Sequence, residues 1–152
     1  MTFVDVVREE INPNEVLGLV GSEQDGANIL FVGRVRNHNE GLSVQGVRYE
    51  AYEDMAKRVL AEIVLEAAGE FGTDRIASVH RIGDLIIGEI SLVVAVSSHH
   101  RKEAFAASRY IIEEIKKRLP VWKRECYLDG NKSWIEGASQ VLRSSDRSDV
   151  MR

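Results

Sequence analysis

Two stretches of the chain repeat apolar residues every three or four positions, the spacing that puts side chains on one face of an α-helix. The stretch 54–71 carries Met55, Val59, Leu60, Ile63, Val64 and Ala67 at this spacing. The stretch 102–119 carries Phe105, Ser108, Ile112, Ile115 and Leu119. Gly72 and Pro120 follow the two stretches, and both residue types typically end helices. The pattern therefore predicts two long amphipathic helices.

The remaining apolar segments are short and rich in β-branched residues, which favours strands. Strands are expected at 3–10, 28–36, 43–52, 75–82, 89–98 and 121–128. The segment 89–98 has an unbroken apolar run and is expected at the centre of a sheet. The segments 28–36 and 43–52 are expected to form a hairpin, with Gly33 marking a bulge in its first strand.

A third, short helix is predicted near the N-terminus. Asn12 is a typical helix cap, Pro13 suits the first helical position, and Glu15 stands three residues after the cap. We expect this helix to end near Gly21.

Composition favours one cytoplasmic domain. The chain has 152 residues, 44% hydrophobic and 29% charged, with one cysteine and a net charge of −4. A lone cysteine allows no internal disulfide, and the overall charge does not favour nucleic acid. Because the N-terminus lacks a secretory pattern and no apolar run reaches the roughly 20 residues of a membrane span, no membrane association is expected. We expect a domain over 1–142 and a fraying polar tail over 143–152.

The corner around Pro120 carries two candidate catalytic lysines. At about 100° per residue, Lys116 falls within about 40° of Phe105 and Ile112, at the edge of the apolar face. Lys123 follows the corner, and Trp122 is expected to form an apolar wall beside it. Desolvation lowers the pKa of a lysine, which can then act as an acid, base or nucleophile. Alternatively, Lys116 packs its stem on the core, or these cations simply face the negative end of the helix dipole.

Two further basic clusters are candidate anion sites. Arg34 and Arg36 would share one face of their strand, and His100 and Arg101 would open the second long helix, where backbone N–H groups favour anions. Each cluster has a plain alternative, a solvated polar face for the first and an ordinary Ser-capped helix start for the second. Cys126 is more typical of a small buried residue than of a nucleophile. No zinc-type spacing of His and Cys exists, so no metal site is expected.

Six segments together resemble one known family. They are FVGRVRNHNEG, YEAYEDMA, HRIGDLIIGE, SSHHRKEAF, PVWKRE and DGNKSWIE, and the resemblance spans Phe3 to Glu136. Their residues and order are similar to those of the large, catalytic subunit of molybdopterin synthase. The resemblance implies an α+β fold of the hammerhead type, with a mainly antiparallel sheet, two long helices and a short N-terminal helix.

The same resemblance implies an activity and its partners. Members of this family are sulfurtransferases of molybdenum cofactor biosynthesis that convert cyclic pyranopterin monophosphate into molybdopterin. The sulfur comes from a thiocarboxylate at the Gly-Gly C-terminus of a small, ubiquitin-like sulfur-carrier subunit. The large subunits form a homodimer at the centre of a heterotetramer, and the resemblance implies no cofactor.

Matching the family's motifs position by position assigns roles to residues of this chain. The resemblance makes Lys116 and Lys123 the catalytic lysines, which also contact the substrate. It assigns the other substrate contacts to Arg34, Val35, Arg36, His100, Arg101, Arg124 and Glu125. The alternative is a non-catalytic module that binds a phosphorylated ligand or a protein tail in the same basic pocket. Such a module would tolerate arginine at both lysine positions, whereas proton exchange would not.

Overall fold

The computed structural model describes residues 1–127, 132–136 and 140–141, with side chains described through residue 127. The expected tail, 143–152, lies outside the described residues. The elements in chain order are β1 (Thr2–Val7), α1 (Pro13–Leu17), β2 (Ala27–Arg34), β3 (His38–Asn39), β4 (Leu42–Ala51), α2 (Glu53–Phe71), β5 (Arg75–Arg81), β6 (Gly83–Ile86), β7 (Ile90–Ser98), α3 (Arg101–Arg118), β8 (Val121–Tyr127), β9 (Lys132–Glu136) and β10 (Gln140–Val141).

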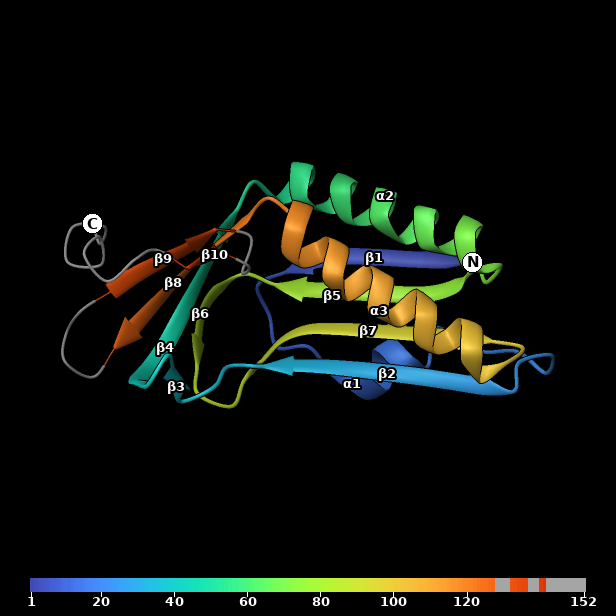
Figure 1. Cartoon of the computed structure of the whole chain (residues 1–152), viewed down its shortest axis with the longest axis horizontal. Helices are drawn as coiled ribbons and strands as arrows, with labels where there is room; N and C mark the ends of the chain where they lie inside the picture. Colours follow the sequence, from blue (N-terminus) through green and yellow to red (C-terminus); the bar gives the residue numbers. More distant parts are fainter. Residues whose placement is uncertain (128–131, 137–139, 142–152) are drawn as a thin grey trace.

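The described strands form two sheets. The first has the order β1-β5-β7-β2, in which only the β1–β5 pair is parallel. Helices α2 and α3 cover one face of this sheet, and α1 packs on the other (Figure 1). The second sheet is antiparallel, with the order β10-β9-β8-β4-β3 and with β6 paired to β4. The expected α+β class, mainly antiparallel with two long helices and a short N-terminal one, is confirmed.

The helix ends follow the sequence signals closely. The Asn12 side chain accepts a hydrogen bond from the Asn14 N–H at 3.0 Å and caps α1. That helix ends at Leu17, earlier than the expected Gly21. Gly72 ends α2 in the left-handed conformation, with φ of 68°, which glycine adopts without steric cost. Helix α3 ends just before Pro120, and its cap is His100 rather than a serine.

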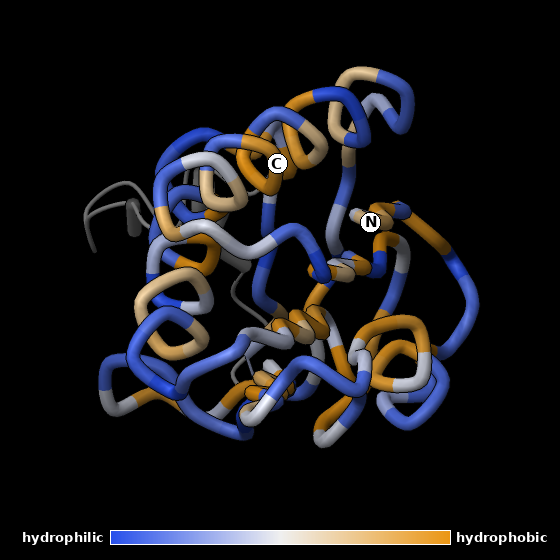
Figure 2. Tube along the Cα trace, turned by 90° about the vertical axis from the view of Figure 1, so that its right-hand side faces the viewer, coloured by the Kyte–Doolittle hydropathy of each residue, from blue (hydrophilic) through white to orange (hydrophobic). Residues whose placement is uncertain are grey.

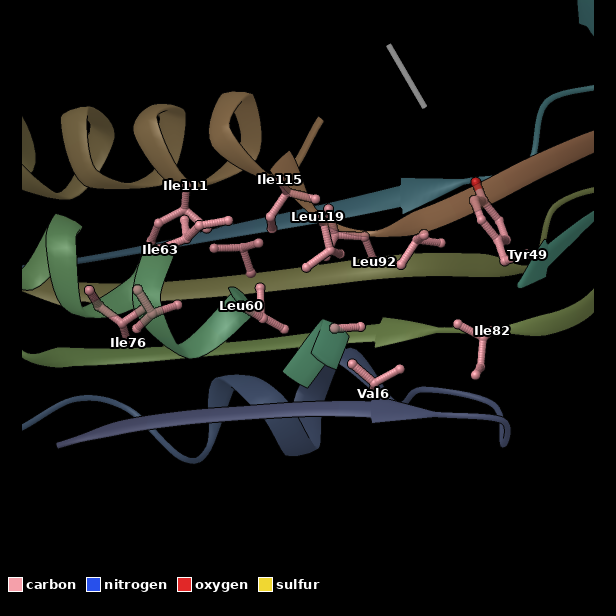
Figure 3. Packing of buried hydrophobic residues seen from close by; sticks show 14 of the residues in the cluster. Val6, Tyr49, Leu60, Ile63, Ile76, Ile82, Leu92, Ile111, Ile115 and Leu119 are labelled. Carbon is pink, nitrogen blue, oxygen red and sulfur yellow. The ribbon is translucent and has the colours of Figure 1, made fainter. Parts of the chain in front are cut away.

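The main core lies between the two long helices and the first sheet. Figure 3 shows Leu60 and Ile63 of α2 meeting Ile111 and Ile115 of α3 above the strands. Seen end-on, hydrophobic residues concentrate on the strands and on the helix turns that face them (Figure 2). The expected apolar faces were partly wrong. Met55 of α2 is 48% exposed. Phe105 of α3 is 60% exposed, because the buried face of α3 turns toward Ala104, Ala107 and Ile111, where it packs against both α2 and the sheet.

The expected hairpin between 28–36 and 43–52 is wrong. Strand β2 pairs with β7 in the first sheet, whereas β4 pairs with β8 in the second. The chain changes sheets after Arg34, and the tight hairpin there joins the short β3 to β4 through Glu40 and Gly41, both with positive φ. The predicted bulge at Gly33 and the central place of β7, paired on both sides, are confirmed. Among the described strands β2 pairs only with β7, so its other edge is open.

A buried histidine should make stability depend on pH. His80 of β5 is 6% exposed, and its Nδ1 lies 2.8 Å from the Arg81 carbonyl oxygen. Burial lowers the pKa of His80 to about 4, against 6.5 when unfolded, so the folded protein holds it neutral. Its contribution to stability is therefore complete above pH 6.5 and is lost as the pH falls toward 4, by about 3 kcal/mol in all.

The measurement is the free energy of unfolding in urea at pH 7 and at pH 4.5. We expect His80→Gln to show a clearly smaller loss between the two values than the unsubstituted protein. Carboxylates with a depressed pKa, such as Glu66 at about 2, act at lower pH and remain in both proteins. An equal loss in the two proteins would remove His80 as the cause.

Candidate active site

An apolar groove runs between α3 and β2, from Phe105 near the start of the helix to Lys116 near its end. The groove has a volume of about 490 Å³. Its lining is Ile29, Leu30, Phe31, Phe105, Ser108, Arg109, Ile112, Glu113 and Lys116. Lys116 thus lies on the same face of α3 as Phe105 and Ile112, as the helical periodicity predicted. Lys116 is itself exposed to solvent, so its place is at the rim of the groove rather than in a buried position. The neighbouring Lys117 lies outside the groove lining, with 66% of its side chain exposed and its Nζ 3.5 Å from Glu114.

Lys123 lies on the inner face of β8, against a buried carboxylate. Its side chain is 19% exposed, and its Nζ is 3.5 Å from Oε2 of Glu125, which is itself only 4% exposed. The other oxygen, Oε1, accepts hydrogen bonds from Asn39 Nδ2 at 2.6 Å and from the Tyr127 hydroxyl at 3.1 Å. Burial raises the pKa of Tyr49, opposite Lys123 on β4, and the charge of Glu125 raises it further. Because these hydrogen bonds hold Glu125 in place, its carboxylate is a fixed counter-charge for Lys123.

Alternation along β8 divides the expected site segment between two faces. Val121, Lys123 and Glu125 share the more buried face of β8, whereas Arg124 lies on the opposite face, with Trp122. Trp122 is 38% exposed and meets Tyr52 edge to face at 6.2 Å between ring centroids. The expectation that Trp122 forms a wall beside Lys123 is therefore wrong, because adjacent residues of a strand point in opposite directions.

The segment 34–36 follows the end of β2 on the same side of the molecule as the Pro120 corner (Figure 1). Arg34 turns aside, and its Nη1 donates to the Gly88 carbonyl oxygen at 2.8 Å in a cavity of about 180 Å³ shared with Arg81 and Glu89. Val35 is buried, and its backbone is bonded to the loop between β6 and β7. Arg36 is exposed beyond the strand end. Of these three residues, Arg36 presents its charge to solvent at the corner.

His100 and Arg101 lie at the opposite end of the first sheet. They open α3, both exposed, whereas Lys116 stands in its last turns. At 1.5 Å per residue, Arg101 is about 22 Å from Lys116 along the helix axis. In the β2–β7 pair, Ala27 lies opposite Ser98 at one end and Arg34 opposite Ile90 at the other. His100 and Arg101, which follow Ser98, are therefore also a sheet length away from Arg36. One copy of the chain therefore does not bring all the expected site residues together.

The corner can bind an anion and exchange protons. Lys116, Lys123 and Arg36 supply cationic donors, and Glu125 balances one of them. Among the described residues, no group of three or more His, Cys, Asp or Glu side chains gathers to hold a metal. Sequence reasoning missed Asn39 and Tyr127. Strand alternation could have predicted Tyr127 on the same face of β8 as Lys123 and Glu125. Nothing in the local sequence ties Asn39 to Glu125, 86 positions away.

Within the described part of the chain, no helix combines the length and apolar character needed to cross a membrane.

Comparison with known proteins identifies the family to which the chain belongs. The family model "MoaE protein" matches residues 6–118. The molybdopterin synthase catalytic subunit of Thermoplasma volcanium is 41% identical over 133 residues, which cover 88% of this chain and 97% of the relative. The catalytic subunit of Escherichia coli K12 is 40% identical over 129 residues, 85% of each chain.

A solved structure extends this agreement to three dimensions. The crystal structure of molybdopterin synthase from Staphylococcus aureus superposes with a TM-score of 0.80 at 40% identity, covering 86% of this chain and 94% of the other. The family match, the sequence identities and the shared fold lead to one assignment. This chain belongs to the MoaE family, the family of molybdopterin synthase catalytic subunits.

Proposed function

We propose that this chain converts cyclic pyranopterin monophosphate into molybdopterin, using sulfur from the C-terminal thiocarboxylate of a small, ubiquitin-like subunit. The observation that carries the proposal is the Pro120 corner. There Lys116 lines one end of an apolar groove, and Lys123 is held against the buried Glu125. Family membership supplies the reaction, and the corner supplies groups suited to it.

The proposed chemistry needs two things from the protein. The phosphate of the substrate needs cationic donors to position it, and Arg36 lies exposed at the corner for this role. Transfer of sulfur from an acyl group also needs proton exchange and stabilisation of a developing oxyanion. An ammonium group can serve either need, so we assign Lys116 and Lys123 as catalytic. Val35 and Glu125 then shape the site around them, whereas Arg34 and Arg124 are directed elsewhere in a single copy of the chain.

We further propose that the functional unit is a dimer with composite sites. His100 and Arg101 stand about 22 Å from Lys116 in one copy, so a second copy must supply them. A two-fold axis that runs two α3 helices antiparallel would place the start of one beside the end of the other. The open edge of β2, with Leu30 and Phe105 exposed beside it, is a surface suited to such a contact.

The small subunit completes the proposed assembly. A Helicobacter pylori structure described as a complex of subunits 1 and 2 of molybdopterin-converting factor has a TM-score of 0.67 with this chain. At 22% identity it establishes the shared fold alone, but it is consistent with a two-subunit enzyme. We place the heterotetramer, with two copies of each subunit, in the cytoplasm, where thiols and thiocarboxylates remain reduced.

The test is direct reconstitution. The purified chain is mixed with thiocarboxylated small subunit and cyclic pyranopterin monophosphate, and dithiolene formation is followed. We expect product only when all three are present, and none when the small subunit ends in an ordinary carboxylate. Binding of the pterin without dithiolene formation would instead support a non-catalytic module.

A further inference from the structure

The side chain of Asn39 joins a surface hairpin to the carboxylate beneath Lys123. Asn39 Nδ2 lies 2.6 Å from Oε1 of Glu125, and the Tyr127 hydroxyl donates to the same oxygen at 3.1 Å. The second oxygen, Oε2, faces Lys123 Nζ at 3.5 Å. Thus two donors hold one carboxylate oxygen, and the other is left for the lysine.

This arrangement fixes the rotation of a buried charge. Glu125 is only 4% exposed, and a buried carboxylate is stable only where its oxygens are paired or hydrogen-bonded. If Asn39 is removed, Oε1 keeps one neutral donor, and the carboxylate can turn so that Oε1 competes for the ammonium group. Lys123 then loses its single defined position.

Asn39 also ties Lys123 to the segment that carries Arg36. The hairpin of β3 and β4 is short, with pairing only between His38 and Ser43 and between Asn39 and Leu42. Arg36 precedes Asn39 by three residues, in the loop that leads into this hairpin. One hydrogen bond thus links the loop to the strand that bears Lys123.

We infer that Asn39 is a positioning residue, which sets the place of the Lys123 ammonium group through Glu125. The inference rests on the proposed function for its catalytic consequence, but not for its geometric one. Asn39 touches neither the reacting atoms nor the substrate in this account.

The catalytic test compares Asn39→Ala with Asn39→Asp in the reconstituted enzyme. Hydrogen bonds to charged groups are strong enough that Asn39→Ala should lower kcat roughly tenfold or more, with little change in the KM for the pterin. Asn39→Asp has nearly the shape of asparagine, but at neutral pH it puts a second carboxylate against Glu125. We therefore expect Asn39→Asp to be slower than Asn39→Ala. The control is His38→Ala, in the same hairpin, which should keep the rate of the unsubstituted enzyme.

The order of these variants decides the matter. If Asn39 merely fills space in the hairpin, the isosteric Asp variant will be nearer to the unsubstituted enzyme than the Ala variant, which would overturn the inference. An equal loss in His38→Ala would overturn it too.

A second measurement does not depend on the reaction. Acetylation of Lys123 relative to Lys117 is followed by mass spectrometry in the isolated chain, with Lys117 as an internal standard exposed to solvent. Asn39→Ala should speed modification of Lys123 by roughly the factor that one such hydrogen bond represents, about tenfold or more. An unchanged ratio would overturn the positioning role even if the enzyme is active. A changed ratio with no dithiolene formation in the unsubstituted enzyme would sustain the positioning role and reject the proposed function.

Discussion

Lys116→Arg and Lys123→Arg should each lose most dithiolene formation while still folding and binding the small subunit. Arginine keeps the positive charge, but its guanidinium stays protonated and cannot exchange a proton with substrate or with the acyl sulfur. A general acid or base typically contributes roughly 10²–10⁴-fold in rate, so the loss in kcat should be of that size. The measurement is single-turnover dithiolene formation with saturating small subunit and pterin.

The chain contains a matched control for this substitution. Lys117 is adjacent to Lys116 on α3, but it does not line the groove and it pairs with Glu114. Lys117→Arg should therefore keep its activity. If Lys116→Arg or Lys123→Arg instead turned over at a near-normal rate, that lysine would be an electrostatic anchor rather than a proton-exchanging group.

Mixing two inactive variants should restore activity if the site is composite. Lys116→Ala and Arg101→Ala would each be nearly inactive alone, because every site of either homodimer lacks one group. In a mixed dimer, one site combines the intact Lys116 of one copy with the intact Arg101 of the other. Random assortment makes half of the dimers mixed, so activity should return to about a quarter of the unsubstituted value.

The experiment distinguishes the composite site from a site within one copy. The two variants carry different affinity tags and are refolded together, and both the mixture and the isolated mixed dimer are assayed. The isolated mixed dimer, with one complete site of two, should show about half of the unsubstituted activity. A mixture of Lys116→Ala with Lys123→Ala serves as the control, since both groups come from the same copy and activity should not return. Light scattering gives the oligomeric state of each variant. No restoration in a verified mixed dimer would place Arg101 outside the site.

Local sequence determined much of the secondary structure of this protein. Apolar residues at helical spacing predicted α2 and α3 to within a residue or so at each end, and Gly72 and Pro120 stopped them. These signals succeed because they act over a single turn of chain: a cap, a ring that cannot continue a helix, a residue tolerant of positive φ. Alternation along β8 is equally local, since residues two apart in any strand share a face, as Lys123 and Glu125 do.

The resemblance to a family supplied the list of candidate site residues, but not their arrangement. It joined Arg36, Lys116 and Arg101 in one site, although the fold holds Arg101 at the far end of α3 in any single copy. The length of a helix separates them, and residue types alone carry no information about which copy contributes each group.

Pairing across long separations was decided by the tertiary structure alone. The chain leaves the first sheet after Arg34, so β2 and β4 do not pair despite lying next to each other in sequence. The rotation of α3 about its own axis, which leaves Phe105 exposed, is set by packing against both α2 and the sheet. The bond from Asn39 to Glu125 spans 86 positions. Strand partners, helix rotation and long-range hydrogen bonds are set by which surfaces can be buried together, and that is a property of the whole packed chain rather than of any local stretch.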